Sequence, residues 1–125
     1  MSDRISQAIV MAHGLATVYR RYGSGRTVVL LGAPDAVALA LSASFLVIVP
    51  EVPLEVSHVT MAVWLGGIYD GLGIVAATIV TTPALAEAAA RLREDAPERV
   101  QDVIIYDHAA PDAAGLREAV ERSFG

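Results

Sequence analysis

The 125-residue sequence contains no cysteine, which excludes disulfide bonds and thiolate chemistry. Charged residues make up only 18% of the chain, and its net charge of -5 comes without a basic stripe, so we expect no nucleic-acid partner. The histidines lack the spacing of metal ligands, and no metal site is predicted. They are His13, His58 and His108.

Long hydrophobic runs are also absent. No apolar stretch reaches the roughly 18 uninterrupted residues that a membrane span needs, because Asp70 and several glycines interrupt the richest one. The first six residues lack the apolar core of a signal peptide, so a cytoplasmic protein without membrane contact is expected. With 54% hydrophobic residues, a chain of 125 residues is long enough for one well-packed domain, which we place at 1–125.

Short β-branched apolar runs alternate with helical patterns along the chain. The sequence predicts strands at 7–13, 15–22, 27–31, 45–49, 76–81 and 100–106. It predicts helices at 36–42, 57–72, 83–94 and 113–124. The alternation is typical of an α/β domain with three layers, in which helices cover both faces of a mostly parallel sheet. We therefore predict about six strands, with a hairpin at the N-terminus.

The helix predicted at 57–72 has an apolar face and an unusual number of glycines. Its apolar residues are spaced by four, three and four positions, as on one side of a helix: Met61, Leu65, Ile68 and Leu72. Each glycine weakens a helix by roughly 1 kcal/mol relative to alanine. Close approach of the helix to the sheet would explain them: Gly66, Gly67 and Gly71. Trp64, in the same segment, is expected in the core or in an interface.

The segment 77–89 is typical of a buried strand, a sharp turn and a helix of small residues. Thr82 is a good helix cap, and Pro83 suits the first helical position. The backbone amides at such a helix start also attract a carboxylate, phosphate or oxyanion, with Thr81 or Thr82 assisting. The structural and the functional interpretation are compatible.

Three further acidic or basic residues follow predicted strands. Asp107 and His108 come after the strand at 100–106, at the carboxyl edge where open α/β sheets bind ligands. Histidine titrates near neutral pH and serves as an acid or a base, although a solvated loop is the alternative interpretation. Glu51 follows the strand at 45–49 between two prolines, either as a general base or as a cap for the next helix.

In order and spacing, these elements resemble the α/β-hydrolase fold family over nearly the whole chain. The segments that carry the resemblance are GLATVYRRYGSG at 14–25, TVVLLGAP at 27–34, FLVIVPE at 45–51, YDGLGI at 69–74 and the stretch 96–107. The resemblance implies that 27–34 is the oxyanion strand and loop, which makes Gly32 and Ala33 candidate ligand-binding residues. It also implies that Asp107 is a relic of the catalytic acid.

The sequence departs from that family where the chemistry takes place. The family motif Gly-x-Ser-x-Gly holds a nucleophilic serine on the turn between a strand and a helix. The corresponding positions here are TTPAL at 81–85, so that Pro83 stands at the nucleophile position. The usual catalytic histidine has no counterpart, because the sequence ends about where a cap domain and the last two strands would begin. A serine mechanism needs nucleophile, base and acid together, so ordinary ester hydrolysis is not expected.

The leading interpretation is a reduced, catalytically degenerate hydrolase-like protein that binds a small, largely apolar metabolite. Its ligand-binding residues are predicted at Gly32, Ala33, Glu51, Thr81, Thr82 and Pro83. Asp107 and His108 would handle protons in a non-hydrolytic step such as cyclisation, dehydration or isomerisation. The alternatives are a non-catalytic pseudoenzyme subunit that acts through protein contacts, and a residual gene fragment without a selected role.

Two further expectations concern a partner and a cofactor. A strand at 103–106 without a neighbour leaves an open edge, which predicts a homodimer through this edge, the terminal helix or both. The glycines at 67–73 resemble a dinucleotide-binding loop, but too few residues separate them from the next strand. No cofactor is therefore expected.

Overall fold

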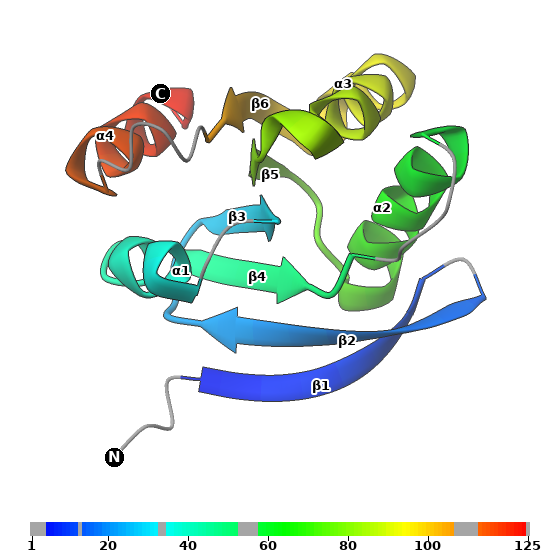
Figure 1. Ribbon diagram of the computed structural model, residues 1–125, viewed down its shortest axis with the longest axis horizontal. Helices are drawn as coiled ribbons and strands as arrows, with labels where there is room; N and C mark the ends of the chain where they lie inside the picture. The colour runs from blue at the N-terminus through cyan, green and yellow to red at the C-terminus, as the bar shows by residue number, and fades with distance from the viewer. Residues whose placement is uncertain (1–4, 13, 33–34, 53–57, 107–112, 125) are drawn as a thin grey trace.

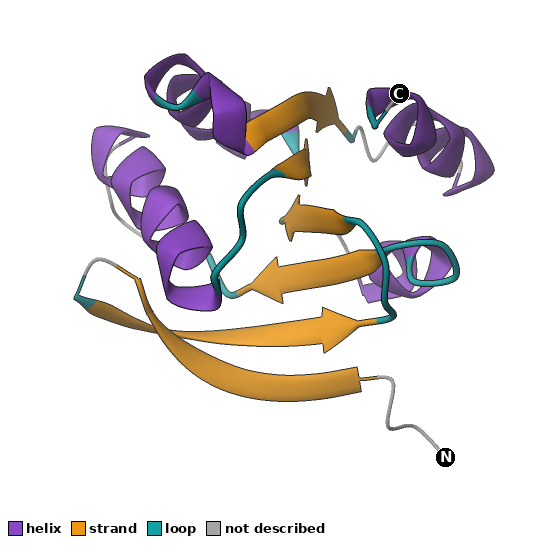
Figure 2. Ribbon diagram, turned by 180° about the vertical axis from the view of Figure 1, so that it is seen from behind, coloured by secondary structure: helices purple, strands orange, loops and turns teal. Residues whose placement is uncertain are grey.

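The structure is a computed structural model that describes residues 5–12, 14–32, 35–52, 58–106 and 113–124. These residues form a six-stranded sheet with helices on both faces (Figures 1 and 2). In chain order the elements are β1 (Ile5–Ala12), β2 (Leu15–Tyr22), β3 (Thr27–Leu31), α1 (Asp35–Leu41), β4 (Leu46–Pro50), α2 (His58–Leu72), β5 (Ala77–Thr81), a 3-10 turn (Pro83–Leu85), α3 (Ala86–Asp95), a second 3-10 turn (Pro97–Arg99), β6 (Val100–Ile105) and α4 (Ala113–Ser123).

The strands lie in the order β1-β2-β4-β3-β5-β6. β1 and β2 form the predicted antiparallel hairpin, and β2 pairs antiparallel with β4. The remaining pairs, β3 with β4, β3 with β5 and β5 with β6, are parallel. The predicted mostly parallel sheet is confirmed, and most element bounds agree within two residues. The helix predicted at 83–94 instead opens with a 3-10 turn before α3 begins at Ala86.

Two hydrophobic clusters fill the space between the sheet and its helices. In Figure 1, α1 and α4 lie to the left of the sheet, and α2 and α3 lie to its right. Val29, Leu31 and Ile79 point into the cluster under α2 and α3. Val28, Leu30 and Val80 alternate with them and point into the cluster under α1 and α4. β3 and β5 are therefore buried on both faces, as their continuous apolar runs predict.

Trp64, expected in the core or in an interface, lies in the core and joins α2 to the hairpin. Its side chain is buried, and its indole Nε1–H donates a hydrogen bond of 2.9 Å to Thr17 Oγ1 on β2. The bond satisfies the buried indole N–H, which would otherwise cost about 1–3 kcal/mol, and Thr17 Oγ1 also donates to the Leu15 carbonyl oxygen at 3.3 Å.

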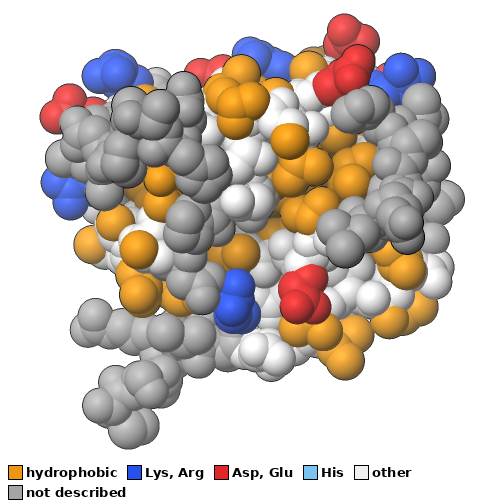
Figure 3. Space-filling view, viewed as in Figure 1, with side chains coloured by type: hydrophobic (Ala, Val, Ile, Leu, Met, Phe, Trp, Pro, Cys, Tyr) orange, Lys and Arg blue, Asp and Glu red, His pale blue; other side chains and the backbone are white. Residues whose placement is uncertain are grey.

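Few charged side chains appear in the middle of the molecular surface seen in Figure 3. Most of them gather along the upper rim, over α3 and α4, although a basic and an acidic side chain also lie just below the centre of this face. None of the described helices is long and apolar enough to cross a membrane.

Close packing requires a glycine at position 71 of α2 but not at position 66. A Cβ added at Gly71 would collide with the Val10 side chain of β1 and would lie 3.1 Å from the Met11 carbonyl oxygen. Close approach therefore explains Gly71, although the neighbour is the hairpin rather than the central sheet. At Gly66 an added Cβ would meet only Leu92 Cδ1, at 3.7 Å, which is an ordinary contact. Close approach does not explain Gly66.

This difference predicts opposite effects for two alanine substitutions in one helix. Gly71→Ala should lower the free energy of unfolding by about 1–3 kcal/mol, because the new methyl group forces α2 away from β1. Gly66→Ala should leave it unchanged or raise it by up to about 1 kcal/mol, because alanine is the better helix former. Urea unfolding followed by circular dichroism measures both. Equal losses in the two variants would contradict the described packing of α2 on β1.

Candidate functional site

The predicted strand, turn and helix after β5 are present. β5 ends at Thr81, Thr82 continues in an extended conformation, and Pro83 opens the 3-10 turn that precedes α3. The Thr82 side chain makes no capping hydrogen bond, so its predicted role as a helix cap is wrong. The Thr82 carbonyl oxygen instead accepts hydrogen bonds from the Leu85 amide, at 3.1 Å, and from Thr81 Oγ1, at 3.0 Å.

The turn packs directly on the end of β3. Gly32 has a φ of +77°, which favours glycine, and a Cβ added there would lie 2.9 Å from Thr82 Oγ1. The Thr82 amide donates a hydrogen bond of 3.2 Å to the Leu31 carbonyl oxygen, which extends the pairing of β3 with β5. The structure thus brings together Gly32 and Thr82, two of the predicted ligand-binding residues.

The end of β6 joins the same edge through its backbone. The Tyr106 amide donates a hydrogen bond of 2.7 Å to the Thr81 carbonyl oxygen, and the Tyr106 side chain is buried. Asp107 and His108 follow Tyr106 in sequence and lie outside the described residues, as does Ala33. Their predicted roles remain predictions.

The polar groups described at this edge are hydroxyls and backbone groups. Thr81 and Thr82 are both buried, whereas Pro83 is exposed and has neither an amide hydrogen nor a reactive side-chain atom. Because the Thr82 hydroxyl faces Gly32 inside the fold, a reacting carbon has little access to it. The described part of the edge therefore offers no accessible side-chain nucleophile.

Glu51 lies apart from this pair. Its amide donates a hydrogen bond of 2.8 Å to the Val18 carbonyl oxygen, which continues the pairing of β4 with β2. Its exposed side chain borders a small cavity of about 40 Å³, whose lining from β1, β2 and β4 includes neither Gly32 nor Thr82. The structure therefore does not bring Glu51 together with the Gly32–Thr82 contact.

Tyr69 is a described residue whose pKa departs from its ordinary value. Burial inside the core under α2 raises the pKa of its hydroxyl, and the positive charge of Arg99 only partly counteracts this. Arg99 itself forms an ion pair of 2.6 Å with Asp70. Tyr69 belongs to the core beneath α2 and does not contribute to the carboxyl edge.

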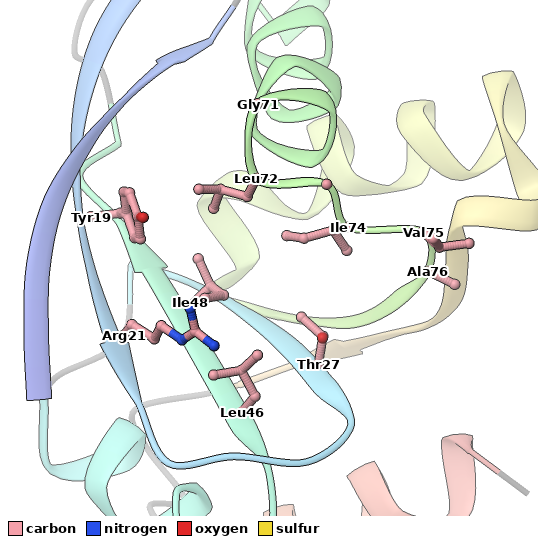
Figure 4. Close-up of a pocket in the computed structure, with 11 residues that line it drawn as sticks. Tyr19, Arg21, Thr27, Leu46, Ile48, Gly71, Leu72, Ile74, Val75 and Ala76 are labelled. Atoms are coloured by element: carbon pink, nitrogen blue, oxygen red, sulfur yellow. The ribbon is translucent and has the colours of Figure 1, made fainter. Parts of the chain in front are cut away.

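A larger cavity lies at the other end of the strands and was missed by the sequence analysis. It has a volume of about 470 Å³ and lies beside the starts of β3 and β4, next to the segment that enters β5 (Figure 4). Tyr19 and Arg21 border it from β2. Both follow the buried Thr17 at intervals of two residues, and this alternation was the available signal that all three share one face.

The contact between Gly32 and Thr82 predicts coupled stability effects. Gly32→Ala should destabilise the fold by about 2 kcal/mol or more, because the strain of a positive φ adds to the collision with the threonine side chain. Thr82→Ala should remove the collision, so that Gly32→Ala costs about 1–2 kcal/mol less in the Thr82→Ala background. Urea unfolding of the four proteins of this cycle measures the coupling. Additive losses would contradict the packing of the turn on β3.

Comparisons with known proteins place this geometry in a fold family. No protein-family model and no curated protein matches the sequence. The structure is similar to an epoxide hydrolase from Vigna radiata, with 18% identity and a TM-score of 0.72, over 82% of this chain and 38% of that one. A haloalkane dehalogenase variant from Bradyrhizobium elkanii has 19% identity and a TM-score of 0.67, over 93% of this chain and 50% of that one.

A third similar structure is a meta-cleavage product hydrolase from Pseudomonas fluorescens, with 25% identity and a TM-score of 0.70, over 77% of this chain and 43% of that one. The chain thus spans half or less of the length of these enzymes. The strand order, the hairpin and the helices on both faces agree with the expected resemblance. The chain therefore has the α/β-hydrolase fold, represented in its described residues by a six-stranded core.

Proposed function

We propose that this chain is a catalytically degenerate α/β-hydrolase-like protein that binds a small, largely apolar molecule at the carboxyl edge of its sheet. The observation that carries the proposal is the turn between β5 and α3, where Pro83 offers no nucleophilic atom and the Thr82 side chain packs on Gly32. The similar structures include epoxide hydrolases and haloalkane dehalogenases, whose names give epoxides and haloalkanes as the compounds they act on. These names support the proposal that this chain binds a small, largely apolar molecule.

The proposed chemistry is a non-hydrolytic step such as cyclisation, dehydration or isomerisation. Such steps move protons without requiring a covalent acyl-enzyme, so the absence of a serine from the turn does not prevent them. We assign proton transfer to Asp107 and His108. The hydrogen bond from the Tyr106 amide to Thr81 supports this, because it fixes the residue before them beside the turn.

Native mass spectrometry of the protein, isolated gently from its own host, tests this proposal. The expected spectrum shows the chain with a bound small molecule, which also supplies the compound for activity assays. His108→Ala should then abolish turnover of that compound, whereas His58→Ala, at the start of α2, should retain it. A stable complex with a second protein and no bound small molecule would contradict ligand binding and place the function at an interface.

A second proposal concerns the partner, which we infer to be another copy of this chain paired along β6. Among the described strands, β6 is the last at its side of the sheet, and Ile105 is 56% exposed there. The apolar residues Leu116 and Val120 of α4 pack into the chain's own core, so they are not available to a partner. The edge itself is thus the better-supported interface. The pseudoenzyme alternative would use the same surface.

Two matched substitutions distinguish this edge from the opposite one. Ile105→Glu should convert the dimer to a monomer, because it places a charge on each of two facing strands. Ile9→Glu should leave the dimer intact, because Ile9 lies on β1, the outer strand at the other side of the sheet, where it is 67% exposed. Sedimentation velocity measures the mass of each. A monomeric parent protein, or a dimer lost only with Ile9→Glu, would contradict the assignment.

A further inference from the structure

We propose that the cavity at the amino ends of the strands binds a small molecule with a carboxylate on an apolar body, and that Arg21 holds the carboxylate. The cavity has a volume of about 470 Å³, within the range of roughly 300–1,000 Å³ that is usual for small-molecule sites. It lies at the opposite end of the sheet from the Gly32–Thr82 contact. This proposal therefore does not depend on the function proposed above.

Strand register places Arg21 among apolar neighbours. Arg21 of β2 pairs directly with Ile48 of β4, and Thr27 of β3 pairs with Leu46 of β4. Directly paired residues point to the same face of a sheet, and all four border the cavity. In Figure 4 the Arg21 guanidinium group reaches over β4, between Leu46 and Ile48, toward the open space.

The wall opposite Arg21 is the end of α2. Gly73 adopts a φ of +68°, and the Ile74 amide donates a hydrogen bond of 2.8 Å to the Tyr69 carbonyl oxygen. This pattern is a Schellman ending, which reverses the chain after the helix and fixes the next residues. Leu72 and Ile74 consequently point into the cavity, whereas Val75 points away and is 84% exposed (Figure 4).

The residues that border the cavity favour a ligand with a carboxylate and an apolar body. Among the described residues that border the cavity, Arg21 carries the one charge, and the Tyr19 and Thr27 hydroxyls add two hydrogen-bonding groups. A guanidinium group binds a carboxylate through two parallel hydrogen bonds. The carbonyl end of α2 is weakly negative, so the apolar body belongs beneath the helix end and the carboxylate beside Arg21.

Binding of 4-phenylbutanoate and of the uncharged 4-phenylbutanamide tests this assignment on the unaltered protein. The two probes have nearly the same shape and differ in charge. We expect 4-phenylbutanoate to bind about tenfold more tightly, as measured by calorimetry, because a hydrogen bond to a charged group is the stronger. Amide NMR shifts should change at Gly73, Ile74 and Ala76, which border the cavity, and not at Gly32 and Thr82.

Two arginine variants complete the test. Arg21→Gln should weaken 4-phenylbutanoate about tenfold and leave 4-phenylbutanamide unchanged, whereas Arg91→Gln, on the exposed side of α3, should change neither. Both positions are exposed, so both variants should fold. Equal binding of the two probes, shifts confined to residues outside the cavity, or the same loss in Arg91→Gln would each overturn the proposal. The comparison of the two probes on the unaltered protein tests carboxylate recognition even if a variant is unstable.

Discussion

The burial of β3 and β5 on both faces is the constraint on which the rest of the structure depends. All five residues of β5 are buried, and four of the five in β3 are buried. Each fully buried aliphatic side chain contributes about 1.5–3 kcal/mol, but only if a helix layer covers its face. Both helix layers are therefore required. The threonines within β5 satisfy their hydroxyls inside the fold, Thr78 with Ser123 and Thr81 with the Thr82 carbonyl oxygen.

The two ends of the sheet differ in how their segments pack. At the carboxyl end, backbone hydrogen bonds continue past β3, β5 and β6, and the turn at Thr82 packs on Gly32. At the amino end, α2 finishes at Leu72 and leaves a cavity in front of β3 and β4. The described segments at the carboxyl end pack on one another, whereas the amino end carries the cavity beside Arg21.

Local sequence patterns predicted the elements well, because continuous apolar runs and turn glycines determine them. They predicted the turn before α3 correctly, and for Trp64 they left the core and an interface open, of which the structure shows the core. They failed for the Thr82 side chain, because its contact with Gly32 joins residues far apart in sequence and replaces the expected cap. They also missed the cavity at Arg21, which is formed by register between β2 and β4 and by the end of α2. Alternation along β2 indicates only that Tyr19 and Arg21 share a face, because the contacts between distant segments that form the cavity leave no local signal.

We infer that this hydrolase fold lacks serine-hydrolase chemistry at its strand–helix turn. The most direct test is to incubate the protein with a fluorophosphonate, which reacts covalently with activated hydroxyl nucleophiles, and to measure the intact mass. The account predicts an unchanged mass, since Pro83 has no nucleophilic atom and the Thr82 hydroxyl is buried against Gly32. A phosphonyl adduct on Thr81 or Thr82, located by peptide mapping, would contradict it.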